Sequence, residues 1–202
     1  ILSGKAGPFL RWPLRREQAT PDTLHVGPPD QVPVTAPARI AIDRAGRMLA
    51  TANFNGGEVR FTDRADQPLT FGPHYDSRYV AVSPDGRWVA TGSHWGTEVK
   101  IWEVGPDRVQ HAKTLPIERM SGVDFSPNGR WLATAGHGMQ LWQVPADEEP
   151  ADAWRRGPEF EGSSLAFSLD GTTLAIQTWY DRPSIRLVDF ESRRELARLT
   201  DP

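Results

Sequence analysis

Short apolar runs recur along the chain, and each is followed by a tight-turn signal and then a second apolar run. The first runs lie at 40–42, 79–82, 123–125 and 165–167, and the second runs lie at 48–52, 88–91, 131–134 and 174–177. The intervening turns carry Gly, which accepts the positive φ of a hairpin turn. The runs are rich in Val, Ile, Trp and Thr and are too short for good helices, so the pattern predicts antiparallel strands.

A third and a fourth strand are predicted in each unit. The third is marked by apolar–polar–apolar triplets: Val59-Arg60-Phe61, Val99-Lys100-Ile101, Met139-Gln140-Leu141 and Ile185-Arg186-Leu187. Period-two alternation places both apolar residues of a triplet on one face of the strand. The fourth strand is more variable and is predicted near 69–71, 112–115, 154–156 and 196–199.

These four units are internal repeats. SPDGRWVATGS (83–93) and SPNGRWLATAG (126–136) are near copies, while SLDGTTLAIQT (168–178) and DRAGRMLATAN (43–53) are more distant versions. The turn glycines Gly46, Gly86, Gly129 and Gly171 are spaced by 40, 43 and 42 residues. That spacing is typical of the four-stranded blades of a propeller.

SPDGRWVATGS followed by VKIWE resembles a WD40 repeat, and so does SPNGRWLATAG followed by MQLWQ. The resemblance covers residues 38–202. It implies an all-β fold, a β-propeller of WD40-type four-stranded blades, with four full blades plus part of a fifth in this chain. We expect the four repeats at about 38–77, 78–119, 120–161 and 162–202.

Residues 1–37 are expected to hold the end of a preceding blade plus a Pro-rich connection. The segment 1–4 resembles the end of a second strand, 10–12 fits the third strand and Leu24–Val26 fits the fourth, with loops at 13–23 and 27–38. The chain would then open in mid-blade, and propellers of this family usually have seven or more blades. We therefore expect the remaining blades to come from sequence before Ile1 or from another chain.

The repeats depart from the family pattern in their polar residues. The Gly-His pair that usually precedes the first strand is not clear, although His74 is a shifted candidate. The Asp expected in the turn before the third strand is mostly absent, whereas the Trp is kept as Trp102 and Trp142. We therefore expect the buried hydrogen-bond tetrad of such blades to be largely lost, with stability depending on burial between sheets.

Composition excludes several classes of protein. A net charge of −3 in 202 residues does not favour nucleic acid or an anionic membrane, and the Arg pairs lack interleaved aromatic residues. The absence of Cys excludes disulfides and zinc–thiolate sites. No apolar run has the roughly 20 residues of a membrane span, and no signal peptide is evident. We expect a cytoplasmic location.

No motif for catalysis, a metal or a cofactor is present. The chain has no nucleophile elbow, P-loop or His ligand spacing, and its five His residues are scattered. We therefore predict a non-enzymatic protein–protein interaction scaffold, the regulatory or sensor end of a longer multidomain protein. The alternative is a propeller enzyme or small-ligand binder using the central channel. The inward-facing first strands show mainly Ala, Val, Ser and Leu, which does not favour that alternative.

Loops on one face of the predicted propeller concentrate aromatic residues and Arg. Loops between the second and third strands emerge on the same face as the loops between blades. Trp, Tyr and Arg are the residues that interface hot spots favour. The predicted partner-binding residues are Phe54, Tyr75, Arg78, Trp95, Trp179 and Tyr180. The competing interpretation is that these aromatic side chains pack between blades in place of the lost tetrad.

Overall fold

The computed structural model describes residues 2–3, 9–16, 23–32, 34, 39–64, 67–117, 122–136, 138–178 and 183–200. Within these ranges the chain forms strands and no helix. Accordingly, no described helix is long and apolar enough to cross a membrane. The chain divides into two compact units, residues 1–36 and residues 37–202.

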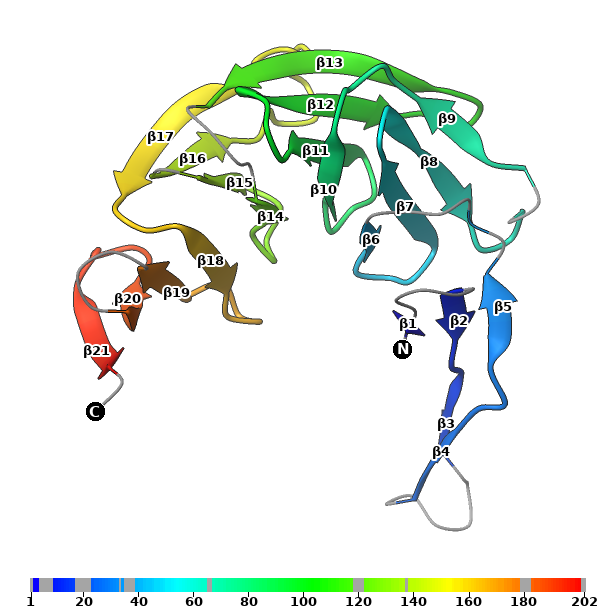
Figure 1. The fold of residues 1–202 in the computed structure, drawn as a ribbon, viewed down its shortest axis with the longest axis horizontal. Coiled ribbons are helices and arrows are strands. Elements are labelled where there is room, and N and C mark those ends of the chain that lie inside the picture. The colour runs from blue at the N-terminus through cyan, green and yellow to red at the C-terminus, as the bar shows by residue number, and fades with distance from the viewer. Residues whose placement is uncertain are drawn as a thin grey trace. The chain divides into compact units, whose positions relative to one another are not determined.

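The second unit consists of four four-stranded antiparallel sheets, which we call blades A to D (Figure 1). Blade A contains β6 (Arg39–Ile42), β7 (Met48–Asn53), β8 (Gly56–Phe61) and β9 (Leu69–Phe71). Blade B contains β10 (Ser77–Val82), β11 (Trp88–Ser93), β12 (Glu98–Val104) and β13 (Val109–Pro116). Blade C contains β14 (Gly122–Phe125), β15 (Trp131–Ala135), β16 (Met139–Gln143) and β17 (Arg155–Phe160). Blade D contains β18 (Ser164–Phe167), β19 (Thr173–Thr178), β20 (Ser184–Asp189) and β21 (Glu195–Thr200).

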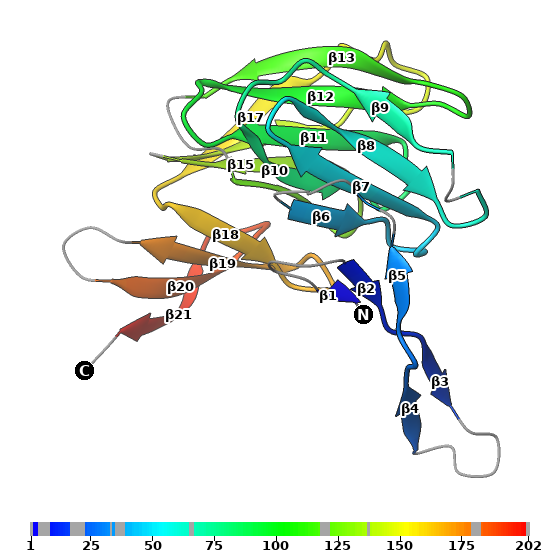
Figure 2. The same ribbon diagram turned by 45° about the vertical axis from the view of Figure 1, so that its right-hand side comes forward.

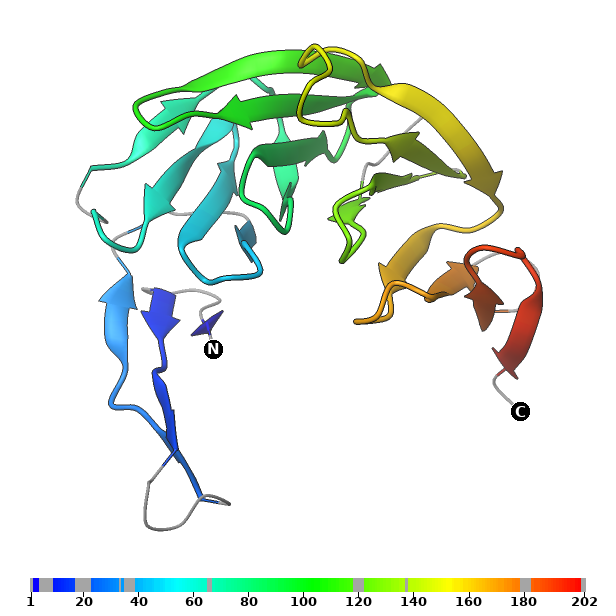
Figure 3. The ribbon, with the colours of Figure 1, turned by 180° about the vertical axis from the view of Figure 1, so that it is seen from behind.

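The strand order within each blade follows the chain, which confirms the predicted all-β class of four-stranded propeller blades. The four blades follow one another around an arc, with the first strand of each blade on the concave side (Figures 1 and 3). The strands start and end within a few residues of the predicted positions. The largest difference is in β17, which begins after Trp154 and continues to Phe160.

The first unit differs from the prediction. β1 (Leu2–Ser3) pairs with β2 (Phe9–Arg11), as expected for the end of a blade, but the next strand in that sheet is β5 (Asp30–Val32). The segment expected to be the fourth strand, β4 (Leu24–Val26), instead pairs with β3 (Leu14–Arg16) in a separate hairpin. The segment that joins β2 to β5 is long enough to form its own hairpin of β3 and β4 before the chain returns to pair with β2.

In blades B, C and D, the hairpins between first and second strands are built by one repeated hydrogen-bond pattern, whereas Asp43 takes the place of the Ser in blade A. In blade B, the Ser83 hydroxyl donates to Asp85 Oδ1 (2.5 Å) and accepts the Trp88 backbone N–H (2.8 Å). The positive φ of Gly86, 82°, then closes the turn. Ser126 with Asn128 and Ser168 with Asp170 repeat the arrangement in blades C and D.

Apolar side chains fill the space between consecutive blades, and Figure 2 shows blades A and B packed face to face. Trp102 lies in the core between these two blades and is 3% exposed. Trp142 lies in the core between blades B and C and is 7% exposed. The prediction that both indole rings are buried between blades is therefore confirmed. A third core joins blades C and D around Met139 and Ile176.

The expected loss of the polar tetrad holds only in part for blade B, where Trp102, Thr91 and His74 form a hydrogen-bonded chain but His74 Nε2 has no partner among the described residues. The Trp102 indole N–H donates to Thr91 Oγ1 (2.8 Å), and Thr91 Oγ1 lies 2.7 Å from His74 Nδ1. Burial, with the Lys100 charge second, lowers the pKa of His74 to about 4, so its ring is neutral at pH 7. The Thr91 hydroxyl also donates to the Lys100 carbonyl at 3.4 Å, so Thr91 connects the indole, the imidazole and the backbone of β12.

The other blades keep less of this network. In blade C the Trp142 indole N–H donates to Thr134 Oγ1 at 3.1 Å. In blade D the positions equivalent to Thr91 and Trp102 are Ile176 and Val188, both buried in an apolar core. The predicted loss of hydrogen bonding thus holds at these positions of blade D, where apolar burial replaces it.

The outer face of blade D is exposed. Ile185 and Leu199 pair across β20 and β21 and are 40% and 58% exposed. Their equivalents in blade B, Val99 and Leu115, pair in the same way and are fully buried against blade C. In blade B, the equivalent positions are covered by the next blade. Where further blades would come from stays a prediction.

Replacing Trp102 or Trp142 with Ala should reduce the free energy of unfolding by about 3–5 kcal/mol, as for other large buried aromatic residues. Trp102→Phe retains most of the packing and loses the hydrogen bond to Thr91, so its cost should be about 1–2 kcal/mol. Urea unfolding followed by far-ultraviolet circular dichroism measures both. Costs below about 1 kcal/mol for both Ala variants would contradict the assigned packing.

Candidate functional site

Three exposed aromatic side chains gather where blades A and B meet, on the loops between strands. Phe54 lies between β7 and β8, Tyr75 precedes β10, and Trp95 lies between β11 and β12. They are 57%, 71% and 76% exposed, respectively. Exposed aromatic rings of this size are uncommon unless they serve recognition, which makes this rim a candidate interaction surface.

Asp76, a residue that the sequence analysis did not identify, holds this rim together. Its side chain is buried, and its φ of 53° places it in the left-handed region that Asp tolerates better than most residues. Its backbone N–H donates to the Phe54 carbonyl (2.7 Å), and its own carbonyl accepts the His94 N–H (3.1 Å). One residue of blade B thereby fixes a loop of blade A and a loop of its own blade.

The Asp76 carboxylate completes the connection. Oδ1 accepts a hydrogen bond from Arg78 Nε at 2.8 Å, and Oδ2 accepts the Trp95 backbone N–H at 3.1 Å. Hydrogen bonds to a charged acceptor are the stronger kind, so Arg78 and Trp95 are both held in place. The guanidinium of Arg78 remains about half exposed and is available to a partner.

Ring contacts support the same side chains. The Phe54 and Tyr75 rings meet edge to face with centroids 4.7 Å apart, and His94 and Trp95 do so at 4.6 Å. These geometries match the preferred arrangement of aromatic pairs. The four residues Phe54, Tyr75, Arg78 and Trp95 thus form one connected surface, which we call the aromatic rim.

The structure therefore brings together four of the six residues predicted to bind a partner. The other two, Trp179 and Tyr180, lie outside the described residues. The competing interpretation, that these aromatic residues pack between blades, does not hold for Phe54, Tyr75 and Trp95, because their side chains are exposed. Asp76 gave no sequence signal of its own, since an acidic residue in a loop usually faces solvent.

Charges beside the aromatic rim are largely paired within the protein. Lys100 Nζ lies 3.3 Å from Glu98 Oε1 and donates to the Pro73 carbonyl at 2.9 Å. Arg78 is paired with Asp76 as described above. The surface therefore offers aromatic area with one oriented guanidinium rather than a strong field of either sign.

A second feature lies on the first strands. A cavity of about 300 Å³ is lined by Arg39, Tyr79, Val80, Gly122, Val123, Asp124, Ala133, Ala135, Ser164 and Leu165. The expectation that these strands show mainly Ala, Val, Ser and Leu was therefore incomplete, because it passed over Arg39, Tyr79 and Asp124. Burial raises the pKa of the half-buried Asp124 to about 6, and a hydrogen bond from the Phe125 backbone N–H partly offsets this effect.

Neither feature is a metal centre. Across the described ranges, no group of three or more His, Asp or Glu residues could hold a metal ion. A single carboxylate in the cavity and a single one in the rim fall short of the ligand sets that metals require.

Comparison with protein families matches the WD40 model, described as "WD domain, G-beta repeat", to residues 66–103 and 110–142. These segments cover blade B and the greater part of blade C. A comparison with curated proteins finds no match. The predicted resemblance is therefore confirmed for the two central repeats.

Three solved structures similar to this chain are Kuenenia stuttgartiensis hydrazine synthase, a putative 6-phosphogluconolactonase from Bacteroides uniformis, and the dihydro-heme d1 dehydrogenase NirN in complex with DHE. Their TM-scores are 0.64, 0.61 and 0.60, at 16%, 15% and 16% identity. The alignments cover 84%, 96% and 81% of this chain but only 50%, 65% and 36% of those chains. At such low identity the likeness shows the propeller fold alone.

Asp76→Ala should release the rim loops without unfolding the blades. The Trp95 amide loses its carboxylate acceptor, so its hydrogen exchange should accelerate by at least about tenfold, the equivalent of 1.4 kcal/mol. Native-state exchange measured by nuclear magnetic resonance tests this, with the exposed Asp63→Ala as the matched control. Unchanged protection of the Trp95 amide would show that Asp76 does not hold the loop.

Asp124→Asn should stabilise the fold at neutral pH. A carboxyl whose folded pKa, about 6, exceeds its ordinary 3.8 stabilises the fold in its protonated form. That contribution is complete below about pH 4 and is lost as the pH rises through about 6. The variant, which is never charged, should therefore melt a few degrees higher than the wild type at pH 7.5 and show little difference at pH 4. Equal effects at both values of pH would contradict the assigned ionisation.

Proposed function

We propose that this chain, which carries WD40 repeats in its central blades, is a non-enzymatic interaction scaffold whose partner docks on the aromatic rim. The observation that carries the proposal is the connection of three exposed aromatic rings and Arg78 through the buried Asp76. A surface that is both apolar and fixed loses little entropy when it binds. The cost of keeping such rings in water suggests that a partner covers them.

The charge pattern indicates the kind of partner. Because Arg78 and Lys100 are already paired with Asp76 and Glu98, a highly acidic partner gains little from them. Aromatic surface with one oriented guanidinium suits a protein segment that presents apolar side chains and backbone carbonyls. Binding should accordingly depend weakly on ionic strength. A regulatory or sensor role within a longer protein, in the cytoplasm, remains part of this proposal.

Photo-crosslinking in native cells tests the docking surface. A benzophenone amino acid at position 75 should capture a partner, whereas the same residue at position 169 should not. Leu169 is a suitable control because it is 86% exposed and lies in the hairpin between β18 and β19, at the opposite end of the strands. Equal capture from both positions, or capture from position 169 alone, would show that the wrong face was chosen.

Variants measure the strength of the same contact. Tyr75→Ala combined with Trp95→Ala should weaken binding of the captured partner at least about thirtyfold, the equivalent of 2 kcal/mol for a hot spot. Glu148→Ala combined with Glu149→Ala, in the acidic loop after blade C's third strand, is the matched control and should bind as the wild type does. Circular dichroism first establishes that both variants are folded. Full binding by the aromatic variant would contradict the proposal.

A further inference from the structure

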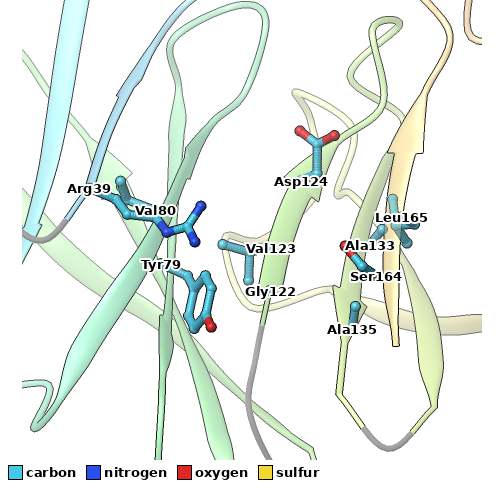
Figure 4. Close-up of a pocket in the computed structure, with 10 residues that line it drawn as sticks. All are labelled: Arg39, Tyr79, Val80, Gly122, Val123, Asp124, Ala133, Ala135, Ser164 and Leu165. Carbon is cyan, nitrogen blue, oxygen red and sulfur yellow. The ribbon is translucent and has the colours of Figure 1, made fainter. Parts of the chain in front are cut away.

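The cavity on the first strands contains two opposite charges, and Figure 4 shows its lining. The Arg39 guanidinium and the Tyr79 ring lie on one side, whereas Ser164 and Leu165 lie on the other. Asp124, on β14, lies between these two sides in this view and lines the same cavity. The first strands of all four blades thus contribute to one site, which no single repeat could form.

The cation of this cavity, Arg39, is held in place by an aromatic ring. The Arg39 guanidinium carbon lies 4.8 Å from the centroid of the Tyr79 ring, in a cation–π arrangement. Among the ion pairs of the described residues, none includes Arg39. A guanidinium fixed by stacking keeps all its N–H donors for a planar acceptor, and a carboxylate is the group that fits such a fork.

The anion of this cavity, Asp124, has no cationic partner among the described residues either. The described residues form no ion pair with Asp124, although its carboxylate is half buried. The causes that set its pKa are burial and the Phe125 backbone N–H, and the charge of Arg39 is not among them. An ammonium group brought into the cavity would supply the missing counter-charge and hydrogen-bond donors.

Apolar side chains separate the two charges. Val123 lies between Arg39 and Asp124 in Figure 4, and Ala133 and Leu165 line the far side of the cavity. At about 300 Å³ the cavity is at the lower end of the size range of small-molecule sites. A nucleotide fits poorly, because one guanidinium does not balance several phosphate charges and Asp124 would repel them.

We propose that this cavity binds a small zwitterion, a free amino acid whose carboxylate pairs with Arg39, whose ammonium pairs with Asp124 and whose aliphatic carbons contact Val123. The proposal goes beyond the interaction role and does not depend on it, because the aromatic rim and the cavity share no residue. It names the chemical class of the ligand that this cavity would bind, and it involves no chemical reaction.

Calorimetric titration of the purified full chain tests the proposal with glycine, 4-aminobutyrate and 6-aminohexanoate, which differ in the distance between their charges. At least one of these zwitterions should bind, and the best one identifies the separation that the cavity accepts. Butyrate and butylamine each carry one of the two charges and should bind at least tenfold more weakly. Butylamine binding as tightly as the best zwitterion, or no binding of any zwitterion at millimolar concentration, would overturn the proposal.

Variants test which residue binds each charged end of the zwitterion. Asp124→Asn and Arg39→Gln should each weaken binding of the best zwitterion at least tenfold, while Asp63→Asn and Arg130→Gln, which change exposed charges elsewhere, should leave it unchanged. Tyr79→Phe retains the ring beneath the guanidinium and should bind as the wild type does. Circular dichroism verifies folding in every case. Wild-type affinity in both Asp124→Asn and Arg39→Gln would show that the cavity does not use its charges.

Discussion

Each blade of residues 39–200 has an apolar face that packs on a neighbouring blade and that cannot be buried within the blade itself. The sheet of blade B buries Val89 and Trp102 against blade A and Trp88 and Ile101 against blade C. Burial of this kind contributes roughly 25 cal/mol for each square ångström of apolar surface, so most of the stability must lie between repeats rather than inside them. The exposed Ile185 and Leu199 of blade D show the same constraint where it is not met by the described residues.

The need to bury apolar faces between blades can be detected in the sequence, because the same residue pattern recurs in each blade. The spacing of Gly86 and Gly129 and the position of Trp102 and Trp142 after their triplets were enough to predict strand order, hairpins and buried rings. The polar network of blade B was harder to predict. His74 occupies a shifted position, and its bond to Thr91 depends on backbone geometry that the sequence pattern does not encode. The pairing of β2 with β5 was also missed, since a long insertion between strands obeys no repeat.

The aromatic rim illustrates which functional features a sequence can and cannot predict. Connectivity alone placed Phe54, Tyr75 and Trp95 on one face, because loops between second and third strands share that face with loops between blades. It could not identify Asp76, whose importance comes from a left-handed backbone and four hydrogen bonds rather than from its residue type. A buried residue such as Asp76, which holds surface loops in place, has no recognisable sequence pattern. The exposed aromatic residues on those loops can be identified from the sequence.

The buried and the exposed polar groups of this protein obey different rules. Inside blade B, several polar groups have partners within the protein: the indole N–H of Trp102 donates to Thr91, and the hairpin backbone N–H groups donate to Ser83 and Asp85. On the first strands, Arg39 and Asp124 form no ion pair with any described residue, and burial of Asp124 opposes its ionisation. Because burial opposes the ionisation of Asp124, a ligand ammonium group that pairs with it would offset that effect, as the zwitterion proposal requires.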